Sequence, residues 1–133
     1  MVPPPRPPSV PPPPGSLEVL TTAEATVVVA AGDLDLAVTD DLAALLDRLV
    51  RQRPAALVFD ASAVTFCAAR VVTILVDATA DAVLNRVPFA VAGRSRSLLR
   101  PIAVLGLDRV VPVHRDAAEA LAWLAVVPLL TER

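Results

Sequence analysis

Few side chains in this sequence could carry out covalent chemistry, because it contains one cysteine, Cys67, and one histidine, His114. A cysteine and a histidine can act together as nucleophile and base. Cys67, however, stands between Phe66 and Ala68, and we expect its thiol to lie in the protein core. There is no second histidine to share a metal ion with His114, and no glycine-rich phosphate-binding motif occurs. The sequence therefore predicts a protein with no catalytic residue, metal site or cofactor.

Hydroxyl and carboxylate groups are the other candidates for a functional site. Ser62, Thr65 and Thr73 carry hydroxyl groups that a kinase could modify. We expect Ser62 and Thr65 to bond to nearby backbone groups instead, which leaves Thr73 as an outside candidate for phosphorylation. Asp33 and Asp35 fall in a predicted turn, where carboxylates usually bond to nearby N–H groups.

Arg70 is an unusual residue for its predicted place near the start of a helix over residues 68–86. A cation at a helix N-terminus opposes the helix dipole, at a cost of about 0.3–1 kcal/mol. We therefore expect an acidic group nearby. On a helical wheel, Arg70 shares a polar face with Thr73, Asp77 and Asp81. Two interpretations stay open. Arg70 either arose by drift and has no functional role, or it makes a dedicated contact with a partner.

Alternating strands and helices must position these residues. Strands are expected at 17–21, 25–31, 57–59, 89–92 and 110–113, and helices after 39, at 68–86, at 97–105 and at 116–126. Gly32-Asp33-Leu34-Asp35 and the segment 60–68 are expected to be turns. Thr39 is expected to cap the first helix, with Asp40 and Asp41 in its first turn. Pro54 should stop that helix, and Pro101 removes one hydrogen bond from the third.

Two of the predicted helices have apolar faces. In the first helix this face comprises Leu42, Leu45, Leu46 and Leu49. In the second it comprises Val71, Ile74, Leu75, Ala78 and Ala82, with Val72, Val76 and Val83 as a second stripe. The extra stripe indicates either deep burial or a groove for a partner. The alternation of strands and helices predicts an α/β domain with a mostly parallel, mixed sheet of about five strands, flanked by about four helices.

The chain of 133 residues is long enough for one domain. Nine of the 14 prolines fall within residues 1–14. We therefore expect a proline-rich disordered leader over residues 1–15, a domain over 16–127 and a tail over 128–133.

Charge and composition exclude several classes of partner. The net charge is -2, and the 12 basic residues are scattered arginines, so nucleic-acid binding is not expected. The sequence contains no run of 18 apolar residues that would insert into a membrane. With a single cysteine, no internal disulfide can form, which fits a cytoplasmic protein.

The segment Asp60-Ala61-Ser62-Ala63-Val64-Thr65-Phe66-Cys67-Ala68-Ala69-Arg70 resembles the signature of the STAS family, the domain of bacterial anti-sigma factor antagonists. In that family the turn reads roughly Asp-x-Ser-Gly-Val-x-Phe-x-Asp-Ser-Ser-Gly-Leu, and a partner kinase phosphorylates the second serine of Asp-Ser-Ser. Ala68, Ala69 and Arg70 occupy those three positions here, and Val71 replaces the glycine. Gly32-Asp33-Leu34-Asp35 resembles the Gly-x-Leu-Asp turn of the family, and residues 106–121 resemble its C-terminal end.

The resemblance implies a non-enzymatic module that binds an anti-sigma factor kinase or a related regulatory protein, without the usual phosphoserine switch. The residues expected to contact the partner are Asp33, Asp35, Ser62, Ala68, Ala69, Arg70, Thr73 and Asp77. Because STAS-like subunits also occur in transporters, the alternative is an accessory subunit of a lipid or small-molecule transport system. A homodimer is compatible with either function.

Overall fold

The fold is that of a computed structural model, which describes the backbone of residues 15–131 and the side chains of residues 15–125. Five strands form one sheet in the order β1-β2-β3-β4-β5. The elements follow the chain as β1 (Ser16–Thr21), β2 (Thr26–Leu34), α1 (Leu36–Arg51), β3 (Leu57–Cys67), α2 (Ala69–Leu84), β4 (Phe89–Ala92), α3 (Arg96–Val104), β5 (Val113–His114) and α4 (Ala117–Thr131). Only β1 is antiparallel to its neighbour, so the sheet is mixed and mostly parallel, as predicted.

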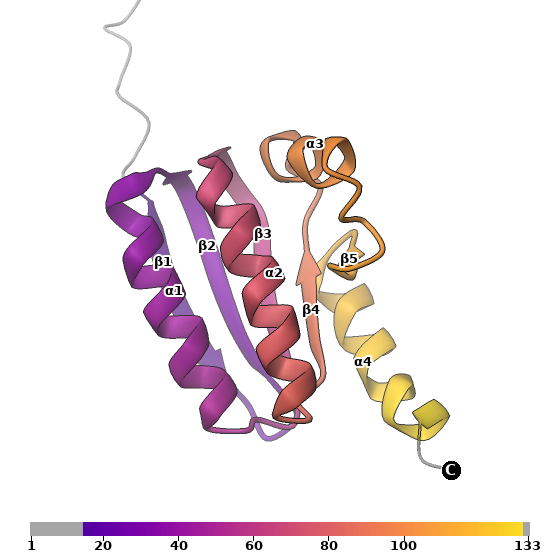
Figure 1. Ribbon diagram of the computed structural model, residues 1–133. Helices are drawn as coiled ribbons and strands as arrows, with labels where there is room; N and C mark the ends of the chain where they lie inside the picture. The colour runs from indigo at the N-terminus through magenta and orange to yellow at the C-terminus, as the bar shows by residue number, and fades with distance from the viewer. Residues whose placement is uncertain (1–14, 132–133) are drawn as a thin grey trace, which may run out of the picture.

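Helices cover both faces of this sheet (Figure 1). Helices α1 and α2 lie against one face over a large apolar cluster that includes Leu46, Phe59 and Leu75. Helix α4 covers part of the other face through a smaller cluster that contains Ala120 and Leu124. Helix α3 lies at the end of the sheet where β3 and β4 finish (Figure 1). Among the described residues, no helix is long and apolar enough to cross a membrane.

The apolar faces predicted for the two long helices are confirmed. Leu42, Leu46 and Leu49 of α1 are buried, and Leu45 packs against the same core. All five members of the predicted α2 face are buried, namely Val71, Ile74, Leu75, Ala78 and Ala82. The second apolar stripe of α2 is only partly buried. Val72 lies in the core, whereas Val83 is 73% exposed.

Several predicted boundaries are wrong, most of them at the ends of strands β2 and β3. Both strands continue through the expected turns, because parallel pairing extends to Leu34 opposite Cys67. Helix α1 consequently begins at Leu36, and its cap is Asp35, whose carboxylate accepts a hydrogen bond from the Ala37 N–H at 3.0 Å. Thr39 is buried inside the helix, where its hydroxyl donates to the Leu36 carbonyl.

The C-terminal part of the domain also differs from the prediction. Strand β5 begins at Val113 rather than 110, because residues 108–111 form turns. Helix α4 continues to Thr131, so part of the expected tail is helical. Helix α3 passes through Pro101. Nearly all of the predicted leader, residues 1–14, lies outside the described residues.

Candidate functional site

The segment that resembles the family signature lies at the end of the sheet where β2 and β3 finish and α1 and α2 begin (Figure 1). Ala68 is the N-cap of α2, and its N–H donates to the Leu34 carbonyl at 2.9 Å, which ties the start of this helix to the end of β2. Its alanine side chain makes no cap hydrogen bond. Ala69 and Arg70 are exposed, so the position that the sequence resemblance assigns to the phosphoserine is accessible from solvent.

Arg70 has an acidic partner within the same chain. Its Nη2 donates to Asp40 Oδ1 of α1 at 2.8 Å, across a sequence separation of 30 residues. This ion pair supplies the compensation expected for a cation near the N-terminus of α2. The Arg70 and Asp40 side chains are 52% and 82% exposed, so the pair stabilises the fold by only about 0.2–1 kcal/mol.

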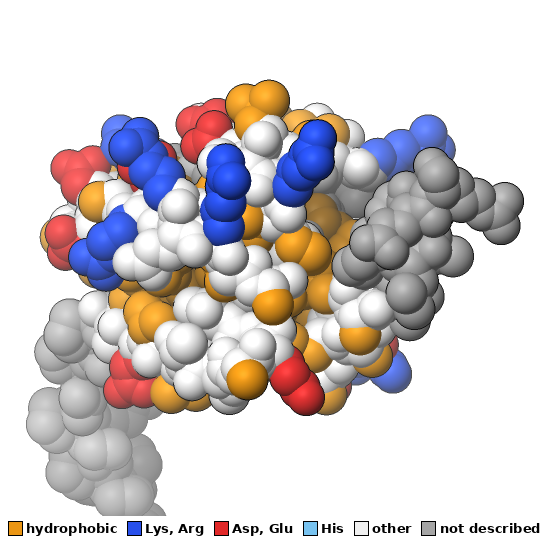
Figure 2. All heavy atoms as spheres, turned by 90° about the horizontal axis from the view of Figure 1, so that it is seen from below, with side chains coloured by type: hydrophobic (Ala, Val, Ile, Leu, Met, Phe, Trp, Pro, Cys, Tyr) orange, Lys and Arg blue, Asp and Glu red, His pale blue; other side chains and the backbone are white. Residues whose placement is uncertain are grey.

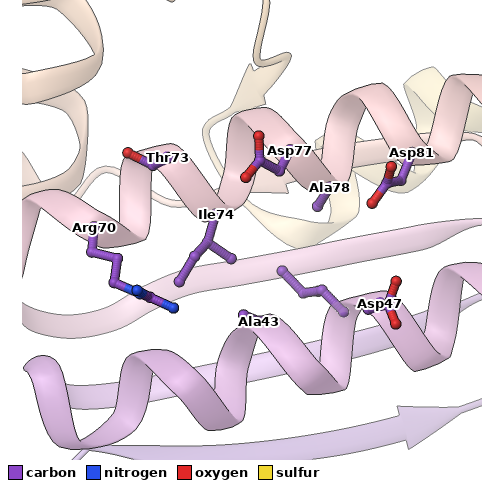
Figure 3. A pocket seen from close by; sticks show the side chains of 9 residues that line it. Ala43, Asp47, Arg70, Thr73, Ile74, Asp77, Ala78 and Asp81 are labelled. Atoms are coloured by element: carbon purple, nitrogen blue, oxygen red, sulfur yellow. The ribbon is translucent and has the colours of Figure 1, made fainter.

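A groove of about 310 Å³ lies between α1 and α2, next to this ion pair (Figure 3). Arg70 stands at one end of the groove, and Thr73 and Asp77 lie along its α2 side. Asp47 of α1 and Asp81 of α2 add two further carboxylates. The groove thus brings together three of the predicted candidates of helix α2, namely Arg70, Thr73 and Asp77.

The hydroxyl and carboxylate candidates outside α2 make local contacts. The Thr65 hydroxyl donates to Asp33 Oδ1 at 2.8 Å, which joins the ends of β2 and β3. Ser62 donates to Asp60 Oδ1 through its hydroxyl at 2.6 Å and through its backbone N–H at 2.9 Å.

Ser62 lies apart from the other candidates, as strand register shows. Asp60 pairs with Val29, whereas the adjacent Val28 and Ala30 belong to the core beneath α1 and α2. Because successive residues of a strand face opposite sides, Asp60 lies on the face away from that core. Its hydrogen-bonded neighbour Ser62 is therefore remote from the α1–α2 groove.

Two large apolar side chains near the signature were missed by sequence reasoning. Phe66 is 51% exposed and pairs with Asp33 in the sheet, and Leu36, the first residue of α1, is 71% exposed. The sequence held a weak signal for Leu36, which follows a capping aspartate. We call Asp33, Leu36, Thr65, Phe66, Ala69 and Arg70 the end surface.

The two residues able to form a nucleophile–base pair are not joined. Cys67 is buried, and burial raises the pKa of its thiol to about 11, so the thiol stays protonated at neutral pH. His114 ends β5 and lies against Trp123, with its Nδ1 3.6 Å from Glu119 Oε1. Within residues 15–125 no hydrogen bond connects Cys67 to His114, and no group of three or more potential ligands could hold a metal ion.

Comparison with known proteins agrees with this geometry. The sequence model of a family described as "Mlab, STAS domain" matches residues 18–112. The chain belongs to the STAS domain family. A curated relative, the anti-sigma-F factor antagonist RsfB of Mycobacterium tuberculosis, is 33% identical over 95 residues, which cover 71% of this chain and 77% of the relative.

Solved structures show the same fold. An anti-sigma factor antagonist from Mycobacterium paratuberculosis superimposes with a TM-score of 0.73 at 26% identity, covering 84% of this STAS chain and 94% of the other. The unphosphorylated antagonist SpoIIAA gives a TM-score of 0.69 at 15% identity, covering 84% and 96%, which supports the fold alone. The predicted family and fold class are confirmed, and the names of these relatives favour the antagonist over the transport alternative.

Proposed function

We propose that this STAS protein is a non-enzymatic, cytoplasmic module that binds an anti-sigma factor through its end surface and lacks the phosphoserine switch. One observation carries the proposal. At the position where the family has its phosphoacceptor, this chain has Arg70, exposed and paired with Asp40 at 2.8 Å. Sequence and structural relatives named as anti-sigma factor antagonists support the choice of partner.

The electrostatics at position 70 oppose the effect of phosphorylation. A phosphoserine carries about -1.5 to -2 charges at neutral pH, enough to disrupt an interface with like charges. Arg70 carries a positive charge and balances Asp40 instead. The end surface therefore cannot acquire the negative charge of a phosphoserine at position 70, and binding is constitutive.

The end surface also has the composition of a protein contact. Interfaces concentrate their binding energy in a few well-packed side chains, often aromatic, surrounded by polar groups. Phe66 and Leu36 supply exposed apolar anchors, and the Asp33–Thr65 hydrogen bond fixes the polar groups beside Phe66.

A binding experiment with purified anti-sigma-F factor, with and without ATP, tests this function. We expect a complex whose Kd is unchanged by ATP, and no phosphate on the chain by mass spectrometry. Phe66→Ala should weaken the complex by about tenfold or more, the loss typical of a central anchor. Stoichiometric phosphate on Thr73, Ser62 or Thr65 would show that the switch has moved. Failure to bind this and other anti-sigma factors would overturn the proposal.

Restoring the family motif provides a second test. In the variant Ala68→Asp/Ala69→Ser/Arg70→Ser, a phosphoserine at position 70 would face the Asp40 carboxylate, so ATP should release the partner. Val71 is fully buried and should be retained, because replacing it with the family's glycine would remove core packing. The matched control carries alanine at position 70 and should stay bound in ATP. Equal release of both variants would contradict the proposed role of position 70.

A further inference from the structure

We infer that the outer face of α3 is a second contact surface, which binds an acidic segment of the same partner protein. Helix α3 buries Leu98 and Ile102. On its other side it exposes Arg96, Arg100 and Val104, spaced four residues apart and therefore stacked along one face. Exposed Arg94 precedes the helix. We call Arg94, Arg96, Arg100 and Val104 the α3 face; the inference rests on the proposed function for the identity of the partner.

Folding does not account for these arginines. Arg94 and Arg96 lie at the start of α3, where the helix dipole disfavours positive charge. The arginine ion pairs of the described residues involve Arg51, Arg70 and Arg115, and none includes an arginine of α3. Their three charges are therefore left for a ligand of opposite sign.

The arginines at the opposite end of the molecule provide a contrast. Seen from below, arginine side chains lie among hydrophobic ones over the end where α1 and α2 finish (Figure 2). Arg48 and Arg51 belong to the last turn of α1, where positive charge is favoured by the helix dipole. Arg51 also pairs with Asp47 at 3.4 Å. Arg48 and Arg51 are accounted for by helix stability, whereas the arginines of the α3 face are not.

The α3 face is continuous with the end surface. The Ser97 hydroxyl of α3 donates to the Thr65 carbonyl at 3.1 Å, and the Thr65 hydroxyl donates to Asp33. A protein seated on Phe66 would therefore come close to α3. The complementary ligand is a segment with two carboxylates one helical turn apart and an apolar side chain for Val104, which is 76% exposed.

Charge reversal on α3 tests this inference. In the full-length chain, Arg96→Glu/Arg100→Glu should weaken the complex with anti-sigma-F factor by about tenfold, and the loss should shrink as salt is raised. The matched control, Arg48→Glu/Arg86→Glu, makes the same charge change at the opposite end, where exposed Arg86 follows α2, and should bind as wild type. Circular dichroism of both variants checks that the fold is retained. If the α3 variant binds as wild type, or both variants lose affinity equally, the inference is wrong.

A model ligand separates this inference from the proposed function. Binding of a fluorescent deca-glutamate peptide should be detectable for wild type and lost for the α3 variant, even if anti-sigma-F factor itself does not bind. Vesicles of phosphatidylglycerol and a single-stranded oligonucleotide serve as competing anionic probes. Preferential binding of either, sensitive to Arg96→Glu/Arg100→Glu, would show that the α3 face recognises a membrane or a nucleic acid instead.

Discussion

At the scale of single residues, the site is defined by charge and burial rather than by reactive groups. Arg70, at the position where the sequence resemblance places a phosphoacceptor, bonds to Asp40. Earlier in the same segment, Cys67 is buried, whereas the preceding residue, Phe66, is half exposed. Adjacent residues thus divide between the core and the proposed interface, so a substitution at one of them need not affect the other.

The buried thiol of Cys67 predicts a loss of stability at high pH. Burial raises the pKa of Cys67 from its ordinary 9.0 to about 11. Because the pKa is raised in the folded state, this contribution to stability is fully present below pH 9.0 and is lost as the pH rises toward 11. The chain has no tyrosine and no lysine, so few other groups titrate in this window.

Urea unfolding between pH 8 and pH 11 measures this effect. The free energy of unfolding of the wild type should fall across the window, and Cys67→Ala should show a flatter profile. Cys67 should also react slowly with iodoacetamide at pH 8, because the thiolate is the reactive form. Parallel profiles for the two proteins would show that the thiol does not titrate as described.

At the scale of elements, strand β3 determines the shape of the site. Its pairing with β2 shifts between Val29 and Ala31 and again between Gly32 and Asp33, so β3 contains two extra residues. Such bulges bend a strand and re-aim its side chains. In the bulged part every third residue is buried, Ala61, Val64 and Cys67, and Phe66 is left exposed.

The glycine after β4 is predicted to be essential for the packing of this bulged strand. Gly93 has φ +125°, and a Cβ there would lie 2.8 Å from backbone atoms of Ala61 and Ser62. Gly93→Ala should therefore lower the free energy of unfolding by about 2–3 kcal/mol. Gly106→Ala is the control, because Gly106 also has a positive φ, +68°, but no atom lies within 4 Å of its Cβ position. We expect a cost of about 1 kcal/mol there, measured by chemical denaturation. Equal losses of stability in the two variants would mean that the positive φ alone, and not the contact with β3, sets the cost of each substitution.

At the scale of the whole molecule, the two core clusters are built from residues 17–124. The larger cluster lies beneath α1 and α2, and the smaller beneath α4. The end surface and the α3 face lie at one end of the sheet, where its parallel strands β2, β3 and β4 finish (Figure 1). The surfaces proposed for partner binding and the two core clusters therefore occupy different parts of the domain.

Deletion of residues 1–14 should leave the folded domain intact. This proline-rich segment has no apolar pattern of the kind that packs against a core, so we expect the free energy of unfolding to change by no more than about 0.5 kcal/mol. Thermal and urea unfolding of the truncated and full-length chains measure the difference. A larger loss would show that the proline-rich segment packs on the domain. Binding of anti-sigma-F factor should be measured in parallel, because Gly15 lies beside Asp33 of the end surface.

The sequence by itself determined the helical faces and the order of strands and helices. The buried face of α2, from Val71 to Ala82, was predictable because helical periodicity is a local property of the chain. The arginine at position 70, where the resemblance places a serine, was equally visible, because it depends only on the sequence.

Only the tertiary structure decided how the site is assembled. The partner of Arg70 is Asp40, and that of Thr65 is Asp33, each about 30 residues away in sequence. The ends of β2 and β3 were predicted as turns, in keeping with the turns of the family that they resemble. They are strands because each supplies the hydrogen-bonding partner of the other, and the exposure of Phe66 follows from the register of that pairing. Strand pairing joins residues that are distant along the chain, so no local pattern could have revealed it.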